Sequence, residues 1–288
     1  MIGKVIKGIG GFYFVKSDDL VIRGQGRGIL KKNKGVIKIG DQVEYELRPD
    51  GECIITKIFA RNNELVRPAI SNIDKLIVTV AAKSPNPNFL SVDKLCIISE
   101  YLNVPVMICV NKIDLIEKNE LGNILDIYKD VYEVVLVDAK HNKGIDELLK
   151  AIEGKTVALV GPSGVGKSTI LNSILPLAKA ETGELSSKTD RGKHTTRHAE
   201  IFSINDNTNI FDTPGFTSLD LPDISIDEIR KLFPEFNSYS KKCRFRDCMH
   251  INEPECSVKS AVEKGLIGDS RYKAYLSFIN EARDNSKY

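Results

Sequence analysis

The sequence contains no apolar run long enough to cross a membrane, and its first residues lack the apolar core of a secretory signal. We therefore expect a cytoplasmic protein with no membrane partner. The net charge is also small, because 41 Lys and Arg residues face 39 Asp and Glu residues. That balance excludes a polycation that would bind nucleic acid over its whole surface.

Cysteines are few, and their spacing argues against a disulfide framework. Cys53, Cys96 and Cys109 stand singly in apolar runs, which is typical of buried thiols. Three thiols and an imidazole near the C-terminus lie within 14 residues and suit a closed tetrahedral Zn²⁺ site, so we expect one structural zinc. The expected ligands are Cys243, Cys248, His250 and Cys256. The flanking residues 224–233 and 258–282 predict helices, and one face of the second, with Tyr272, Tyr275, Leu276 and Ile279, is expected to be core.

A chain of 288 residues with 42% hydrophobic residues is long enough for two or three domains. Basic residues exceed acidic ones by 12 to 8 in residues 1–65 and by 12 to 10 in residues 224–288, whereas residues 66–223 carry 17 against 21. This pattern predicts outer modules that touch nucleic acid around an acidic central domain. Excesses of this size are equally typical of ordinary solvated surfaces.

Residues 1–65 alternate between short apolar stretches and turns that contain glycine. About five strands in this length predict a small β-barrel, which we interpret as an OB-fold that binds RNA. One or two rings of Phe12-Tyr13-Phe14 could stack on bases, but strand alternation would place some of them in the core.

A glycine-rich stretch follows the apolar run of residues 156–160 and precedes a helical pattern. Strand, glycine turn and helix form the context of a phosphate-binding loop, in which backbone N–H groups and the helix dipole surround an anion. Lys167 would reach the β- and γ-phosphates in binding and catalysis, and the Ser168 hydroxyl would ligate Mg²⁺. The residues expected to bind GTP here are Gly161, Pro162, Ser163, Gly164, Val165, Gly166, Lys167, Ser168 and Thr169.

A second motif would select the base of the bound nucleotide. It is Asn111-Lys112-Ile113-Asp114, which matches the N-K-x-D element of GTPases. The Asp114 carboxylate can accept hydrogen bonds from both N1–H and the exocyclic amine of guanine, a pattern that adenine does not offer. Asn111 would bond the base edge and the phosphate loop, and the Lys112 stem would cover the ring face.

The segment Asp138-Ala139-Lys140 occupies the place of the S-A-K loop of GTPases. The backbone N–H of Ala139 would meet guanine O6. Asp138 replaces the usual serine, which leaves the role of its side chain open.

Asp212-Thr213-Pro214-Gly215 matches the D-x-x-G element, in which the carboxylate holds Mg²⁺ through water and the glycine N–H meets the γ-phosphate. The polar segment before it, residues 181–198, predicts a switch loop. One threonine there would complete the Mg²⁺ shell, and Thr196 is slightly favoured over Thr195.

Phe216 stands where Ras-like enzymes carry a glutamine that orients water. Because a phenyl ring cannot position water, intrinsic hydrolysis should be slow unless another group supplies that function. His194 or a residue of a partner is a candidate, and an inert, exposed His194 fits the sequence equally well.

The order of these motifs is unusual, because Asn111 precedes Gly161 by 50 residues, whereas in Ras-like GTPases the base-reading element follows D-x-x-G. Strands of a doubly wound sheet are held by pairing and packing, so relocated termini can leave the site intact in space. The sequence therefore predicts a circularly permuted GTPase whose D-x-x-G element leads into the C-terminal module.

Together with Gly192-Lys193-His194-Thr195-Thr196, these motifs make the chain resemble, over essentially its whole length, the bacterial small-ribosomal-subunit-dependent GTPases of the circularly permuted class. The resemblance implies an N-terminal OB-fold β-barrel (1–65), a central circularly permuted α/β P-loop GTPase domain (66–223) and a mainly helical zinc-binding domain (224–288). It implies a cytoplasmic monomer that binds the 30S subunit and its 16S rRNA. It also implies GTP hydrolysis, stimulated by that subunit, in late small-subunit maturation. In this family the histidine that matches His194 is thought to be catalytic.

Two other functions stay open at this point. One is a GTP-regulated RNA-binding switch that acts away from the ribosome. The other is a P-loop kinase, in which the Asp114 carboxylate would be incidental.

Overall fold

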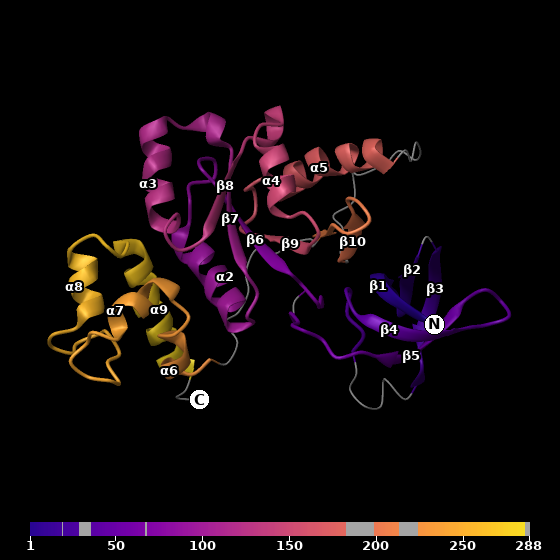
Figure 1. Ribbon diagram of the computed structural model, residues 1–288, viewed down its shortest axis with the longest axis horizontal. Helices are drawn as coiled ribbons and strands as arrows, with labels where there is room; N and C mark the ends of the chain where they lie inside the picture. The colour runs from indigo at the N-terminus through magenta and orange to yellow at the C-terminus, as the bar shows by residue number, and fades with distance from the viewer. Residues whose placement is uncertain (19, 29–35, 67, 183–198, 213–223, 286–288) are drawn as a thin grey trace. The chain divides into compact units, whose positions relative to one another are not determined.

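The computed structural model describes the chain except residues 19, 29–35, 67, 183–198, 213–223 and 286–288 (Figure 1). The chain divides into two compact units, each discontinuous in sequence. Unit 1 comprises Met1–Leu76, Ile145–Val160 and Ser168–Phe216, and unit 2 comprises Ile77–Gly144, Gly161–Lys167 and Thr217–Tyr288. Across the described residues, no helix has the length and apolar character needed to cross a membrane.

The first part of unit 1 is a closed five-stranded β-barrel, as predicted. Its strands are β1 (Ile2–Ile9), β2 (Phe12–Ser17), β3 (Leu20–Gly26), β4 (Gln42–Leu47) and β5 (Cys53–Ile58). The ring closes because β2 pairs with both β1 and β3, and the order then runs β3, β5, β4 and back to β1. Alternate residues point inward and are fully buried, namely Val5, Val15, Val43, Tyr45 and Ile55.

The rest of unit 1 is an α/β sheet with its helices. Its elements are β9 (Thr156–Val160), β10 (Glu200–Ser203), β11 (Asn209–Asp212), α4 (Ile145–Ala151) and α5 (Lys167–Thr182), the last of which starts at the final residue of a unit 2 segment. β11 lies between β10, which is antiparallel to it, and β9, which is parallel. Every residue of β9 is buried, which explains its continuous apolar sequence.

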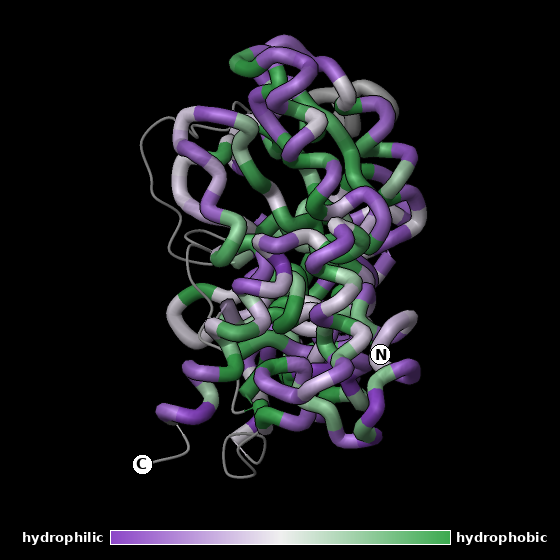
Figure 2. Tube along the Cα trace, turned by 90° about the vertical axis from the view of Figure 1, so that its left-hand side faces the viewer, coloured by the Kyte–Doolittle hydropathy of each residue, from purple (hydrophilic) through white to green (hydrophobic). Residues whose placement is uncertain are grey.

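Unit 2 contains further strands. The elements here are β6 (Lys75–Ala81, beginning in unit 1), β7 (Val106–Asn111), β8 (Glu133–Val137), α2 (Phe89–Tyr101), α3 (Lys118–Tyr128) and the 3-10 helices η1 (Ile113–Leu115) and η2 (Ala139–His141). β7 lies between β6 and β8, is parallel to β8 and is buried along its length. Along the chain, Figure 2 shows hydrophobic stretches in green alternating with polar stretches in purple.

The C-terminal part of unit 2 is a small helical lobe with α6 (Ile226–Ile229), η3 (Pro234–Phe236), α7 (Asn237–Ser240), α8 (Ser257–Glu263) and α9 (Asp269–Asn285). The helix expected over residues 224–233 is a single turn, and the one expected over 258–282 is two helices. The break lies at Gly265, which has a φ of +68° and donates its N–H to Val262 O. A left-handed glycine in this position ends α8.

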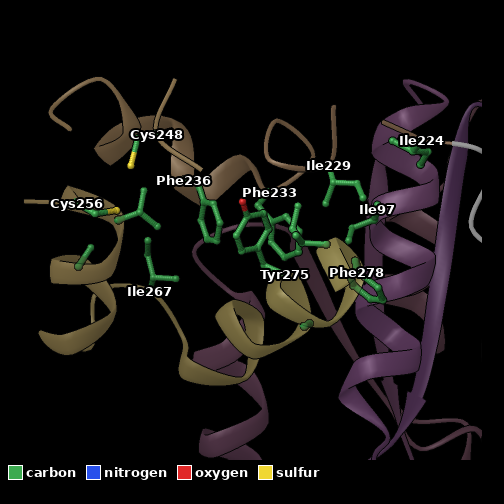
Figure 3. Packing of buried hydrophobic residues seen from close by; sticks show 14 residues of the cluster. Ile97, Ile224, Ile229, Phe233, Phe236, Cys248, Cys256, Ile267, Tyr275 and Phe278 are labelled. Carbon is green, nitrogen blue, oxygen red and sulfur yellow. The ribbon is translucent and has the colours of Figure 1, made fainter. Parts of the chain in front are cut away.

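Aromatic side chains form the core of this lobe (Figure 3). The Phe233 ring lies 5.0 Å from Phe236 and 5.3 Å, edge to face, from Tyr275. Ile97 of α2 belongs to the same buried cluster, so the lobe shares its core with a helix that flanks β7. Tyr275 and Ile279 are fully buried on the face of α9 that the sequence predicted to be core.

A buried arginine also joins the lobe to α2. Arg271 on α9 is 1% exposed, and it donates from Nη1 to Asp93 Oδ1 (2.8 Å) and from Nε to Glu235 Oε1 (2.7 Å). Tyr128 donates its hydroxyl to the same Asp93 oxygen (2.9 Å). Burial raises the pKa of Asp93, and the charge of Arg271 acts in the opposite direction. The charges tolerate this interior because they are paired.

Replacing Arg271 with alanine should destabilise unit 2, because Asp93 and Glu235 would lose their buried counter-charge. We expect the free energy of unfolding to fall by about 3–5 kcal/mol. Urea titration followed by far-UV circular dichroism measures the change.

The matched control is Lys273→Ala, since Lys273 is exposed on the same helix and pairs with the exposed Asp269. It should change the free energy of unfolding by less than about 1 kcal/mol. Equal effects of the two substitutions would contradict the role assigned to Arg271.

Candidate functional site

The glycine-rich loop joins β9 to α5, and three of its glycines have positive φ angles. These are +145° at Gly161, +79° at Gly164 and +98° at Gly166. A Cβ on Gly161 would lie 2.2 Å from Thr79 O, so no side chain fits there. The loop ends at the N-terminus of α5, where helix N–H groups favour an anion.

Lys167, the first residue of α5, lies against this loop. Its Nζ donates to Gly161 O (2.6 Å) and Pro162 O (2.8 Å), and burial lowers the pKa of Lys167. Val165 is buried and Ser163 is exposed, while Ser168 and Thr169 are exposed in the first turn of α5. The loop therefore combines a cation, a helix N-terminus and accessible hydroxyl groups.

Asn111, at the end of β7, connects three loops. Its side chain is 2% exposed, and its Nδ2 donates to Val165 O of the glycine-rich loop (2.9 Å), which is the link expected from the sequence. Its Oδ1 accepts the backbone N–H of Ala139 (3.2 Å). The contact of the same N–H with guanine O6 stays a prediction.

Gly166 and Lys112 complete this junction. A Cβ on Gly166 would lie 2.2 Å from Asn111 Nδ2, so the amide reaches the loop only because residue 166 is glycine. Lys112 has a left-handed backbone with φ +62°, and its ammonium donates to Gly164 O (2.7 Å) and to Ser84 O. The N-K-x-D segment and the glycine-rich loop are thus fixed to each other by two side chains.

Asp114 is exposed in η1, and a residue that sequence reasoning missed lies close to it. Ligand atoms of Asp114, Asp138 and His141 all lie within 4.8 Å of one another. His141 Nδ1 lies 2.9 and 2.8 Å from the two carboxylate oxygens of Asp138, which is 1% exposed. The only sequence signal for this pair is its spacing of three residues across the turn.

The residues expected to bind Mg²⁺ and to form the switch are described only in part. Asp212 ends β11, the parallel neighbour of β9, and both Asp212 and Ser168 belong to unit 1. His194, Thr195, Thr196 and Gly215 lie outside the described residues. A carboxylate and a hydroxyl are the oxygen ligands that Mg²⁺ prefers.

The four expected metal ligands converge in the C-terminal lobe. Cys243 Sγ lies 3.6 Å from His250 Nδ1 and 4.0 Å from Cys256 Sγ, and His250 Nδ1 lies 3.3 Å from Cys256 Sγ. All four ligand atoms, Cys248 Sγ included, lie within 4.8 Å of one another. Tetrahedral Zn²⁺ with Zn–S bonds of about 2.3 Å requires such separations. The cluster is therefore compatible with zinc.

The surroundings also suit a metal. Burial lowers the pKa of His250, which favours the neutral imidazole that binds metals. Tyr272 donates its hydroxyl to His250 O (2.7 Å), and Tyr275 donates to Met249 O. These bonds from α9 hold the backbone that presents the imidazole.

Comparison with known proteins gives consistent matches over the chain. A family model described as RsgA GTPase matches residues 58–222, and one described as RsgA N-terminal domain matches residues 2–55. A small ribosomal subunit biogenesis GTPase RsgA of Alkaliphilus metalliredigens is 43% identical over 289 residues, 99% of each chain. A protein of Clostridium perfringens with the same name is 41% identical over 282 residues, 98% of each chain.

Solved structures match equally well. YjeQ from Thermotoga maritima is 32% identical with a TM-score of 0.83 over 98% of each chain. YloQ, described as a circularly permuted GTPase, is 34% identical with a TM-score of 0.81 over 99% of this chain and 95% of its own. The predicted fold class of barrel, circularly permuted GTPase and helical C-terminal lobe is confirmed.

Proposed function

Since the chain belongs to the RsgA family of GTPases, we propose that it binds the small (30S) ribosomal subunit and hydrolyses GTP there late in the maturation of that subunit. The relatives from Alkaliphilus metalliredigens and Clostridium perfringens are small ribosomal subunit biogenesis GTPases. Their similarity over nearly the whole chain supports the same function for this protein. Its cofactors are GTP or GDP, Mg²⁺ and one structural Zn²⁺.

The observation that carries the GTPase function is the double hydrogen bond of Asn111. It joins Val165 of the phosphate loop to Ala139, beside the carboxylate-bearing Asp114 segment. One nucleotide can then contact a phosphate cradle and a base-reading carboxylate at the same time. Asp114 accepts from the guanine edge, the Lys112 stem covers the ring and residues 138–139 close the base pocket.

At the phosphate end, the P-loop residues 161–169 hold the β- and γ-phosphates, and Lys167 neutralises charge that develops between them. Ser168, Asp212 and Thr196 are the residues proposed to hold Mg²⁺, which neutralises the phosphate oxygens when bound. Thr195, Thr196, Asp212 and Gly215 form the proposed switch. His194 is proposed to orient the attacking water, since Phe216 has no polar group to do so.

The outer modules are proposed to contact 16S rRNA. In the barrel, the Arg23 guanidinium lies 3.7 Å from the Phe12 ring centroid, and none of Phe12, Tyr13 and Phe14 is fully buried. In the C-terminal lobe, Phe245 is 41% exposed between the exposed Arg244 and Arg246. Rings that are at least partly exposed are suited to stack on bases, and the neighbouring cations are suited to follow phosphates. We propose module boundaries near residues 65 and 223, and a cytoplasmic monomer.

Substituting Asp114 with asparagine should exchange base preference. Asparagine offers an amide donor where the carboxylate accepted, so GTP affinity should fall at least about a hundredfold, and xanthosine triphosphate should bind better than GTP. Isothermal titration with both nucleotides measures this. Unchanged preference for guanine would remove Asp114 from the base site, and Asp126→Asn, an exposed site on α3, is the control.

Replacing Cys248 with serine should abolish zinc binding and loosen the C-terminal lobe. Elemental analysis of the purified protein should give about one zinc per chain, and the variant should retain little, because a serine hydroxyl does not replace a thiolate. Cys109→Ser, a buried thiol of β7 outside the cluster, should keep its zinc. Wild-type protein without zinc would contradict the assignment.

GTP turnover by the chain should be slow alone and rise at least about a hundredfold with purified 30S subunits, which supply or order the water-positioning group. The measurement is phosphate release with 30S, with 50S and with neither. Equal rates would favour the alternative of a GTP-regulated RNA-binding switch that acts away from the ribosome. Co-sedimentation with 30S but not 50S subunits separates the two functions independently.

A further inference from the structure

The loop of residues 138–143 is closed on itself. The Asp138 N–H donates to Lys143 O (2.9 Å) and the Lys143 N–H donates to Asp138 O (3.0 Å). Gly144, with φ +73°, turns the chain into α4 where a Cβ would lie 1.9 Å from Leu136 O. These contacts fix the backbone conformation of the loop. Its orientation then depends on the hydrogen bonds that Ala139 and Asp138 make.

The Asp138 carboxylate is buried and points back into its own loop. Its Oδ1 accepts the His141 N–H (3.2 Å), and both carboxylate oxygens face His141 Nδ1 (2.9 and 2.8 Å). This geometry requires Nδ1 to carry the proton and to donate it. The imidazole itself remains half exposed, with 49% of its side-chain surface accessible.

Asp138 also lies close to the acid assigned to guanine recognition. Ligand atoms of Asp114 and Asp138 are within 4.8 Å of each other, and His141 lies within the same distance of both. Two carboxylates this close repel each other, so the buried Asp138 needs hydrogen-bond donors of its own, and His141 supplies them. A serine in place of Asp138 would create no such conflict.

We propose that His141 is a positioning residue for guanine recognition, which engages the Asp138 carboxylate and thereby keeps Asp114 available as the acceptor for the guanine edge. This inference rests on the proposed guanine site. The backbone of the same loop is held by the Ala139 N–H, which donates to Asn111 Oδ1, and Asn111 in turn donates to Val165 O of the glycine-rich loop. His141 touches neither nucleotide nor phosphate in this role; it acts through Asp138.

The test measures the affinity of the full chain for GDP, for inosine diphosphate and for ADP. Inosine lacks only the exocyclic amine that Asp114 binds, so the ratio of GDP to inosine diphosphate affinity reports on that carboxylate. His141→Ala should weaken GDP binding about tenfold and lower this ratio. His141→Asn, which places an amide donor near the position of Nδ1, should restore both within about threefold. Glu147→Ala, exposed on α4, is the control and should match wild type.

The same substitution made in a variant that lacks the Asp138 carboxylate tests whether His141 acts through Asp138. In Asp138→Ser, where the carboxylate is gone, adding His141→Ala should change GDP affinity less than about twofold. If His141→Ala lowers the affinities for GDP and for inosine diphosphate equally, His141 only stabilises the loop, and the proposal is wrong. A full tenfold loss of GDP affinity on adding His141→Ala to Asp138→Ser would also contradict it. If wild-type protein fails to prefer GDP over ADP, the guanine site itself is wrong. If the wild-type protein prefers GDP and His141→Ala binds GDP with wild-type affinity, the guanine site stands and only the role proposed for His141 is wrong.

Discussion

The side-chain amide of Asn111 is the contact on which the nucleotide site depends. The amide is almost fully buried. Its Nδ2 donates to Val165 O and its Oδ1 accepts from the Ala139 N–H, so one side chain holds together segments that are 26 or more residues apart. The amide lies so close to the loop that even a methyl group on Gly166 would collide with it. The glycine at 166 is thus required by the asparagine at 111 as much as by the phosphate that the loop would hold.

This constraint also explains why a permuted motif order is compatible with a GTPase. The site needs the ends of β7 and β8 and the glycine-rich loop in one place. Parallel pairing brings the ends of β7 and β8 together, and the Asn111 bond to Val165 holds the loop beside them, wherever the chain begins. Lys112 adds a second connection, from the base-reading segment to Gly164 and Ser84. The covalent order is then free to vary, and in this chain it places the D-x-x-G strand, β11, after the base-reading strand and before the C-terminal lobe.

How much the sequence could predict depended on whether each signal was local. The strands feeding Gly161 and Asn111 were predictable because buried parallel strands read as continuous apolar runs, and the four metal ligands because they lie within one short segment. The helices after residue 224 were predicted too long, since the apolar periodicity runs on through Gly265 while the left-handed backbone there does not. Two features could not be predicted from local sequence: the buried ion pairs of Arg271, whose partners are 36 and 178 residues away, and the bond of Ala139 to Asn111. Such pairs are defined only by the packing of distant segments.

Helix α2 shows how the loops around Asn111 and the C-terminal lobe are packed together within unit 2. The residues that lead into it include Ser84, which accepts from Lys112, and Pro85, which would lie 3.6 Å from a Cβ on Gly164. Further along, Asp93 receives Arg271, and Lys94 pairs with Glu281 at 2.9 Å. Arg271 is one turn from Tyr275 on α9, whose hydroxyl holds the backbone next to His250. The glycine-rich loop, Lys112, the buried ion network and the Cys3His cluster are therefore connected by contacts of α2, of the residues just before it and of α9. A lobe with so small a core can stay attached to the rest of unit 2 because its ion network and its Cys3His cluster are both held by the same α9.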